Sequence, residues 1–207
     1  MRTTVLLFSI GLLVTGCKNP GADVTPATVE PAAEAKAESP APVETDEVLE
    51  INPSNTKIGF VGAKVTASHE GGFNDFSGKL VLGDPIETSQ IEVTIQTASL
   101  YADREKLTKH LKSPDFFDVA KFPAAQFRST KISSKSDGGH MISGELTLHG
   151  VTMSVGVPAD IRVTETEVLA TSEFSINRQD FGIKYAGMAD DLIRDLVVIK
   201  LSLKLPR

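Results

Sequence analysis

The chain has 207 residues, of which 41% are hydrophobic, and it carries a net charge of −6 and a single cysteine. One cysteine excludes a disulfide bond within the chain, and the excess of acidic residues argues against a nucleic-acid partner, because binding to phosphates requires a basic surface. The length is sufficient for one folded domain that buries a core without covalent cross-links.

The first residues have the pattern of an export signal. Arg2 supplies a positive charge, and residues 5–14 form an apolar run that is too short to cross a bilayer as a helix. The run ends in Val14-Thr15-Gly16-Cys17, which resembles the lipobox of bacterial lipoproteins. This resemblance implies a signal peptide at residues 1–16 and lipidation of Cys17 with acyl chains such as palmitate. An ordinary signal peptide that precedes a chance cysteine is the alternative.

The lipobox resemblance also carries an expectation about location. A diacylglyceryl group and an added N-acyl chain on Cys17 would suffice for stable attachment to a membrane. We therefore expect an exported, cell-envelope lipoprotein on the periplasmic face of a membrane. Residue 18 is lysine, whereas an aspartate there would resemble a retention signal of the inner membrane, so the sequence favours the outer membrane.

Residues 17–48 form the next segment, in which Cys17 is followed by a stretch rich in Ala, Pro and Glu. Residues 18–48 hold two lysines and seven acidic residues, so about five of the six net negative charges lie here. Such a composition cannot bury a core, and we expect a disordered tether with a reach of roughly 30 Å. The remaining domain is nearly neutral.

Residues 49–207 form the folded domain, and their apolar residues alternate with a period of two. In residues 197–205 every odd position is apolar, whereas the even positions are polar after Val198. This pattern is typical of antiparallel strands with one buried face. Turn signals separate eight such segments, and we expect strands over residues 56–66, 73–83, 91–96, 123–135, 140–149, 151–157, 167–177 and 197–205.

One helix is predicted, from Asp103 to Lys112. Asp103 is the expected N-cap, Leu107 and Leu111 share one face, and Ser113-Pro114 ends the helix. Eight antiparallel strands with one helix are compatible with a sandwich or with a closed barrel that holds a small ligand. The alternation alone leaves both open.

Five motifs resemble the YceI-like, polyisoprenoid-binding family and follow one another in that family's order. They lie at residues 73–80, 110–118, 122–127, 144–152 and 176–183. The resemblance spans nearly all of residues 50–205. It implies an all-β fold with one short helix, an eight-stranded antiparallel lipocalin-like β-barrel. It also implies that the barrel holds a long apolar chain, which would be a polyisoprenoid, an isoprenoid quinone, or a fatty acid or amide.

Inward-facing apolar residues are the candidates for the wall of such a cavity. Alternation and position predict ten of them: Phe60, Leu80, Ile95, Phe116, Phe117, Phe127, Met153, Phe174, Ile199 and Leu201. The alternative for each residue is that it fills a solid core, because small barrels are often packed throughout. The helix and the segment around Phe116 are expected to cover one end.

Three polar residues are candidates for contact with a head group. Arg178 and Asp180 form a nearby pair of opposite charges that either steers a head group or pins the following loop, and the fixed geometry of an arginine–carboxylate pair favours pinning. His110, on the predicted helix, is expected near the mouth of the cavity.

The sequence offers no sign of catalysis or metal binding. Its four histidines, at positions 69, 110, 140 and 149, have no zinc-binding spacing, and no nucleophile motif is present. We therefore expect a binding protein without catalytic residues, metal or cofactor other than the lipid ligand. An enzyme acting on such a lipid and a ligand-free interaction module are the alternatives, and pairing of two copies into a homodimer stays open.

Overall fold

A computed structural model describes residues 19–32 and 47–207 of the chain. Within these residues it contains one α-helix, three short 3-10 helices and fourteen strands. The strands are β1 (Thr28–Pro31), β2 (Glu47–Ile51), β3 (Thr56–Ala63), β4 (Ser68–Phe73), β5 (Phe76–Leu82), β6 (Gln90–Gln96), β7 (Leu100–Ala102), β8 (Ala124–Ser134), β9 (His140–Leu148), β10 (Val151–Val163), β11 (Glu167–Asn177), β12 (Gly187–Met188), β13 (Asp191–Leu192) and β14 (Leu196–Pro206). The helices are η1 (Ile86–Thr88), η2 (Thr97–Ser99), α1 (Glu105–Leu111) and η3 (Arg178–Phe181).

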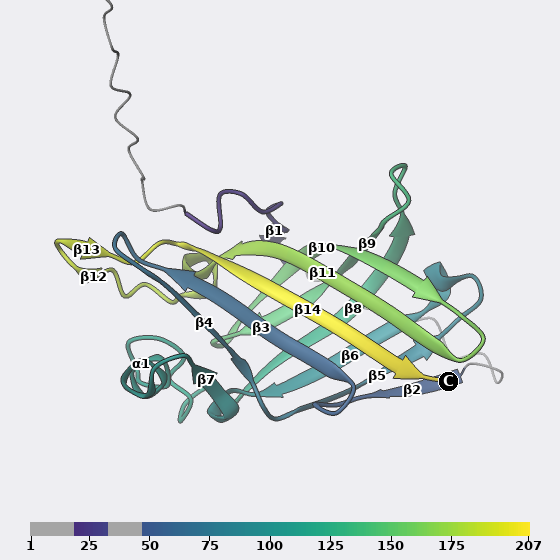
Figure 1. Cartoon of the computed structure of the whole chain (residues 1–207), viewed down its shortest axis with the longest axis horizontal. Coiled ribbons are helices and arrows are strands. Elements are labelled where there is room, and N and C mark those ends of the chain that lie inside the picture. The colour runs from purple at the N-terminus through teal and green to yellow at the C-terminus, as the bar shows by residue number, and fades with distance from the viewer. Residues whose placement is uncertain (1–18, 33–46) are drawn as a thin grey trace, which may run out of the picture.

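Twelve of the described strands form one antiparallel sheet that curls into a barrel (Figure 1). The strand order is β2-β5-β6-β8-β9-β10-β11-β14-β3-β4-β7, with β1 attached to β10. The short hairpin β12–β13 forms a separate sheet at the end of the barrel that also carries α1 (Figure 1). The expected all-β barrel with one short helix is confirmed. All eight predicted strands are present, but shorter strands add to them.

The long strands follow the two-residue alternation of the sequence. β14 pairs with β11 over its whole length, from Leu196 opposite Asn177 to Pro206 opposite Glu167. On β14, Lys200 and Ser202 are exposed on one face, whereas on the other face Leu203 is half-buried and Leu205 is fully buried. One face of this ladder therefore lies in water and the other is buried, as antiparallel sheets allow.

Strand β4 was missed in the sequence because it lacks an apolar alternation. Its backbone instead fits closely between β3 and β7. A Cβ atom at Gly71 would lie 2.4 Å from Cζ of Phe60 and 2.3 Å from the carbonyl oxygen of Tyr101. Glycine is therefore required here so that the inward ring of Phe60 can lie against the backbone of β4.

The segment between residues 25 and 31 corrects the prediction of a disordered tether. β10 and β11 pair only from residues 160–163 to 168–171, and beyond this point β1 pairs with residues 153–156 of β10. On its other side the segment bonds to β11, where the amide of Ala27 donates to the carbonyl oxygen of Ser175 at 2.8 Å. Residues 25–31, which we call the strap, thus fill a gap in the barrel wall. Residues 33–46 of the expected tether, together with the signal, Cys17 and Lys18, lie outside the described residues.

The helix α1 is shorter than expected, and Asp103 is not its N-cap. The residue at that position is Arg104, which makes no side-chain capping bond. The Asp103 carboxylate instead lies 3.0 Å from Nδ1 of His69 on β4. The Asp103 side chain is therefore engaged with the imidazole of His69 and does not cap the helix.

Candidate binding cavity

The barrel encloses a cavity of about 610 Å³ whose wall is formed almost entirely by apolar side chains. The cavity follows the chain from Thr56 on β3 to Lys64 just beyond that strand, and β14 from Val197 to Leu205. Eight residue steps along a strand correspond to roughly 26 Å. The cavity is therefore long and narrow, and its shape matches an extended chain better than a compact molecule.

Nine of the ten predicted wall residues line this cavity. They are Phe60, Leu80, Ile95, Phe116, Phe117, Phe127, Phe174, Ile199 and Leu201. The aromatic members come from distant parts of the chain and meet inside: the ring centroids of Phe60 and Phe73 lie 6.2 Å apart, and those of Phe73 and Phe117 lie 6.0 Å apart. That these residues contact a ligand stays a prediction.

Met153 is the exception and does not line the cavity. It is partly buried against a cluster that includes Leu148 and the fully buried Phe181. Val155 and Val157, which follow on the same face of β10, do reach the cavity. Alternation thus identified the correct face of the strand, but it carries no information on where along the barrel the interior becomes solid.

Small residues on the inner face were missed in the sequence, although they make room for the cavity. Ala125, Ala159 and Ala170 lie in the wall on β8, β10 and β11. Gly62 on β3 also lies in the wall, and a Cβ atom built on it would have no atom within 4 Å. The two-residue period of their strands would have placed them inward, but their size gave no reason to single them out.

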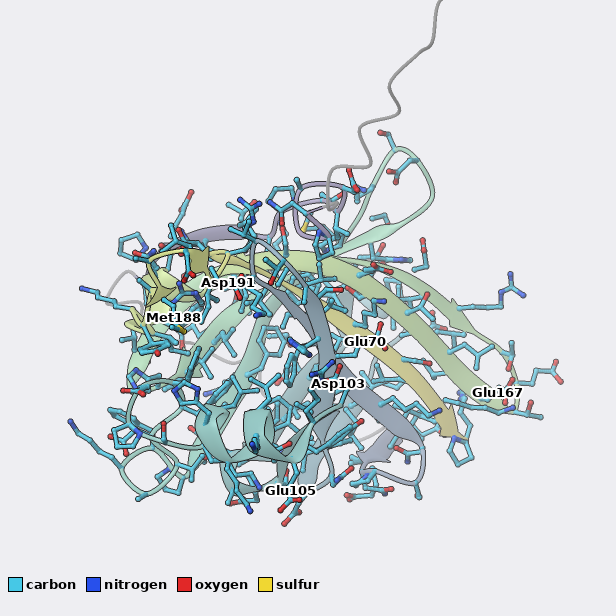
Figure 2. The ribbon with its side chains drawn as sticks, turned by 60° about the vertical axis from the view of Figure 1, so that its left-hand side comes forward. Glu70, Asp103, Glu105, Glu167, Met188 and Asp191 are labelled. Carbon is cyan, nitrogen blue, oxygen red and sulfur yellow. The ribbon has the colours of Figure 1, made fainter. Side chains whose placement is uncertain are left out.

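Polar groups gather at one end of the cavity, which we call the mouth. Lys64 forms an ion pair with Asp191 of β13, and Thr66 Oγ1 donates to the same carboxylate at 3.0 Å. Figure 2 shows Asp191 beside Met188 on the hairpin. The bond from Lys64, together with those from Thr66, lowers the pKa of the Asp191 carboxyl below its usual range.

Arg178 is buried below the mouth and holds the loop that forms it. Its guanidinium donates to the carbonyl oxygens of Ile183 at 2.6 Å and Arg194 at 3.1 Å, and it bonds to Oδ1 of Asp195 at 3.0 Å. Burial lowers the pKa of Arg178, and Asp195 partly opposes this effect. The expected partner, Asp180, is wrong: its residue is exposed, and Asp195 takes its place from 17 residues further along the chain.

His110 lies at the mouth, as its place on the helix suggested. Its Nε2 is 2.9 Å from Oδ2 of Asp115, and its ring packs edge-on against Phe116 and Tyr185 at centroid distances of 5.0 and 5.1 Å. This aromatic cluster joins the helix to the loop that Arg178 holds. Two sides of the mouth are thereby tied together by packing.

The remaining histidines do not form a metal centre. His149 Nδ1 contacts the carbonyl oxygen of Phe181 at 3.2 Å, and His69 is paired with Asp103. Among residues 19–32 and 47–207, no group of three or more His, Cys, Asp or Glu side chains could hold a metal ion. The predicted absence of catalytic residues stays a prediction.

In the part of the chain that the structure describes, no helix is both long enough and apolar enough to span a bilayer.

Comparison with known proteins relates this architecture to a family. A family model described as the YceI-like domain matches residues 49–205. A UPF0312 protein of Shewanella denitrificans is 37% identical over 124 residues, which are 55% of this chain and 63% of that protein. The chain thus matches less than two thirds of this relative's length.

Solved structures share the fold at lower identity. Burkholderia cenocepacia BcnA superimposes with a TM-score of 0.68 at 22% identity, over 74% of this chain and 98% of that one. A polyisoprenoid binding domain from Saccharophagus degradans, implicated in plant cell wall breakdown, has a TM-score of 0.58 at 15% identity, over 77% and 97% of the two chains. At these identities the similarity shows the fold, and it confirms the barrel.

Proposed function

The chain belongs to the YceI-like family, and we propose that its barrel binds one long apolar lipid for sequestration or transport in the cell envelope. The ligand class is a polyisoprenoid, an isoprenoid quinone, or a fatty acid or amide. The observation that carries the proposal is the apolar cavity of about 610 Å³ along the barrel. A related barrel from Saccharophagus degradans is described as a polyisoprenoid binding domain, which supports this class.

The energetics of such binding need only apolar contact. Each methylene group removed from water contributes about 0.8 kcal/mol, so about ten groups contribute on the order of 8 kcal/mol before the cost of ordering the ligand. The cavity volume lies within the ~300–1,000 Å³ that is common for ligand sites. A lipid would therefore bind without a specific polar contact, and its length and width would set the selectivity.

Binding is favoured over catalysis because the polar groups at the mouth are engaged with one another. Lys64 is paired with Asp191, His110 with Asp115, and Arg178 with backbone carbonyls and Asp195. An enzyme acting on a lipid needs polar groups that converge on the reacting atoms inside the site. Between these pairs and the far end of the cavity the wall is almost entirely apolar, and the hydroxyl of Ser172 in this wall donates to the carbonyl oxygen of Pro158.

Export and lipidation of Cys17 complete the proposal. A lipid attached to the mature N-terminus would hold the barrel at a membrane surface, where its ligands are dissolved. The periplasmic face of the outer membrane is the location that the sequence favours.

The test uses Gly62, because this position opens into the cavity without meeting another atom. The delipidated full chain is titrated with cis-parinaric acid, a fluorescent long-chain fatty acid. A Gly62→Phe ring would displace about two methylene groups of the ligand, and we expect roughly tenfold weaker binding.

Two matched variants serve as controls. Gly62→Ala adds only a methyl group and should bind almost as the unaltered chain does. Ser202→Phe places the same aromatic ring on the exposed face of β14 and should leave binding unchanged. Equal binding by all four proteins would contradict a ligand inside the barrel, because only one variant narrows it.

A further inference from the structure

The mouth of the cavity is bordered by three exposed apolar side chains. Met188 is 70% exposed, Leu192 is 49% exposed and Val65 is 41% exposed. Figure 2 shows Met188 at one end of the molecule, on the hairpin that extends beyond the main sheet. We call these three residues the apolar rim. Exposed side chains of this size contribute nothing to the core, so the rim needs another explanation.

The structure holds the rim in place. The amide of Val65 donates to the carbonyl oxygen of Leu192 at 3.1 Å, and Lys64 forms an antiparallel bridge with Ile193. Within the hairpin, Met188 pairs with Asp191 and Gly187 pairs with Leu192. Arg178 fixes the base of the same loop through the carbonyls described above. The rim is therefore a built surface and not a free end.

The rim is continuous with the interior of the barrel. Met188 lines the cavity as well as its mouth, together with the ring of Tyr185 and the side chain of Ile193. An apolar surface thus runs from the exposed tip of the hairpin into the cavity. A lipid that leaves the barrel here meets the rim before it meets open water.

The N-terminal part of the described chain lies at the same end. Gly21 is buried against β14, where a Cβ atom would lie 2.6 Å from Cβ of Leu196. Leu196 begins β14, shortly after the hairpin. Cys17 precedes Asn19 by two residues, and two residues span at most about 7 Å. A lipid on Cys17 would therefore anchor the barrel close to its mouth.

Charge around the rim is nearly balanced. Lys64 and Arg194 line the mouth together with Asp191, and Glu105 begins α1 at the same end of the barrel (Figure 1). Attraction to anionic lipids therefore adds little at the rim. Any docking here depends on apolar contact.

We propose that the apolar rim docks the mouth of the barrel onto a phospholipid bilayer. Val65, Met188 and Leu192 enter the interfacial layer, and the lipidated N-terminus holds this end against it. The ligand then passes between bilayer and cavity without crossing water. The passage of the ligand and the anchoring through Cys17 rest on the proposed function, whereas contact of the rim with the bilayer does not.

The experiment measures how deeply the rim enters the bilayer. The full chain is purified from bacterial membranes with Met188→Cys or Leu192→Cys, labelled with the fluorophore NBD, and reconstituted into vesicles of phosphatidylethanolamine and phosphatidylglycerol with brominated acyl chains. Apolar surfaces of interfacial proteins enter about 5–10 Å, so we expect roughly twofold quenching relative to unbrominated vesicles. The unaltered chain should not take up label, since a lipidated Cys17 has no free thiol. If the unaltered chain does take up label, NBD fluorescence is measured on variants that also carry Cys17→Ser, added directly to the vesicles.

Val163→Cys provides the matched control. Val163 is 42% exposed and lies at the opposite end of the barrel, where it pairs with Val168 at the start of β11. We expect no quenching there. Equal quenching at both ends, or none at either, would overturn the proposal. If the NBD group at residue 188 became shielded from water but was not quenched, a second copy or another protein would be the occupant. This result would also overturn the proposal.

Failure of docking and failure of lipid binding give different results. Quenching reports contact with the bilayer whether or not the cavity is filled. The cis-parinaric acid titration reports the cavity in the absence of vesicles. A Val65→Ser/Leu192→Ser chain, altered at the two rim residues that do not line the cavity, should keep its affinity for cis-parinaric acid but take it up from vesicles several-fold more slowly.

Discussion

The two ends of the barrel are built in opposite ways. At the end opposite the mouth, which we call the closed end, three core residues are almost completely buried: Ile51, Val168 and Leu205. Arg207 pairs there with Glu47 at 2.8 Å. At the mouth, α1 has no buried residue, and apolar side chains of the hairpin are exposed. One end therefore supplies stability, whereas the other is free to open and to contact a partner. Elements with few buried contacts are also those that open most easily.

The largest expected effect is on stability at the closed end. Leu205→Ala removes a fully buried side chain, and we expect a loss of about 2–5 kcal/mol in the free energy of unfolding. Leu192→Ala at the mouth should change it by less than ~0.5 kcal/mol, because this residue is exposed. Urea denaturation of the full chain followed by circular dichroism measures both. Similar losses would remove the distinction between the two ends.

A smaller effect is expected at the base of the mouth. Arg178→Leu leaves the carbonyl oxygens of Ile183 and Arg194 without their donor, which should cost about 1–3 kcal/mol. Amide hydrogen exchange should become faster in residues 182–195 before any change at the closed end. Asp180→Ala is the control, since this residue is exposed, and it should leave exchange unchanged. Faster exchange spread evenly over the barrel would argue against a local role.

The strap can be compared with the long strands of the barrel, because it is part of the same wall although its strand β1 has only four residues. Val29 packs against the buried cluster beneath it, whereas Glu30 is exposed. Val29→Asp should cost about 1–3 kcal/mol by bringing a charge to an apolar contact. Amides of β10 at residues 153–156 should exchange faster, and those of β14 should not. Glu30→Ala should behave as the unaltered chain.

The smallest effect concerns pH. The Asp191 carboxyl has a lowered pKa because Lys64 and Thr66 stabilise its charged form. Its contribution is therefore present at neutral pH and is lost only as the pH falls below the ordinary value of 3.8 through the lowered pKa. Amide signals of the hairpin, followed by nuclear magnetic resonance, should not change between about pH 8 and pH 5. A transition near pH 6 would show that another group controls the hairpin, and Asp191→Asn should abolish the acid transition.

The sequence predicted the features that depend on local patterns and missed those that depend on contacts between distant residues. The long strands and nine wall residues followed from alternation and from the family motifs, because both are local patterns. The strap was missed because backbone pairing with β10 and β11 does not require apolar side chains. Likewise, β4 contains glycines that let its backbone lie close to the neighbouring strands. In the sequence, these glycines are more typical of a loop than of a strand.

The errors at the mouth have a related cause. Asp195, not Asp180, pairs with Arg178, because the chain folds back over 17 residues and no local pattern records that return. Met153 faces inward but lies where Phe181 fills the interior. The exposed rim was also not predicted. Strands β12 and β13 have two residues each, which is too short for a pattern of alternation to be recognised.

The most direct test of the account is native mass spectrometry of the full chain, purified from bacterial membranes in a mild detergent, followed by organic extraction of the same sample. We expect one long-chain lipid for each protein molecule, which the extract identifies as a polyisoprenoid, a quinone or a fatty acid or amide. A protein that carries no lipid and also fails to take up added quinones or prenyl lipids would contradict it and would favour a ligand-free interaction module.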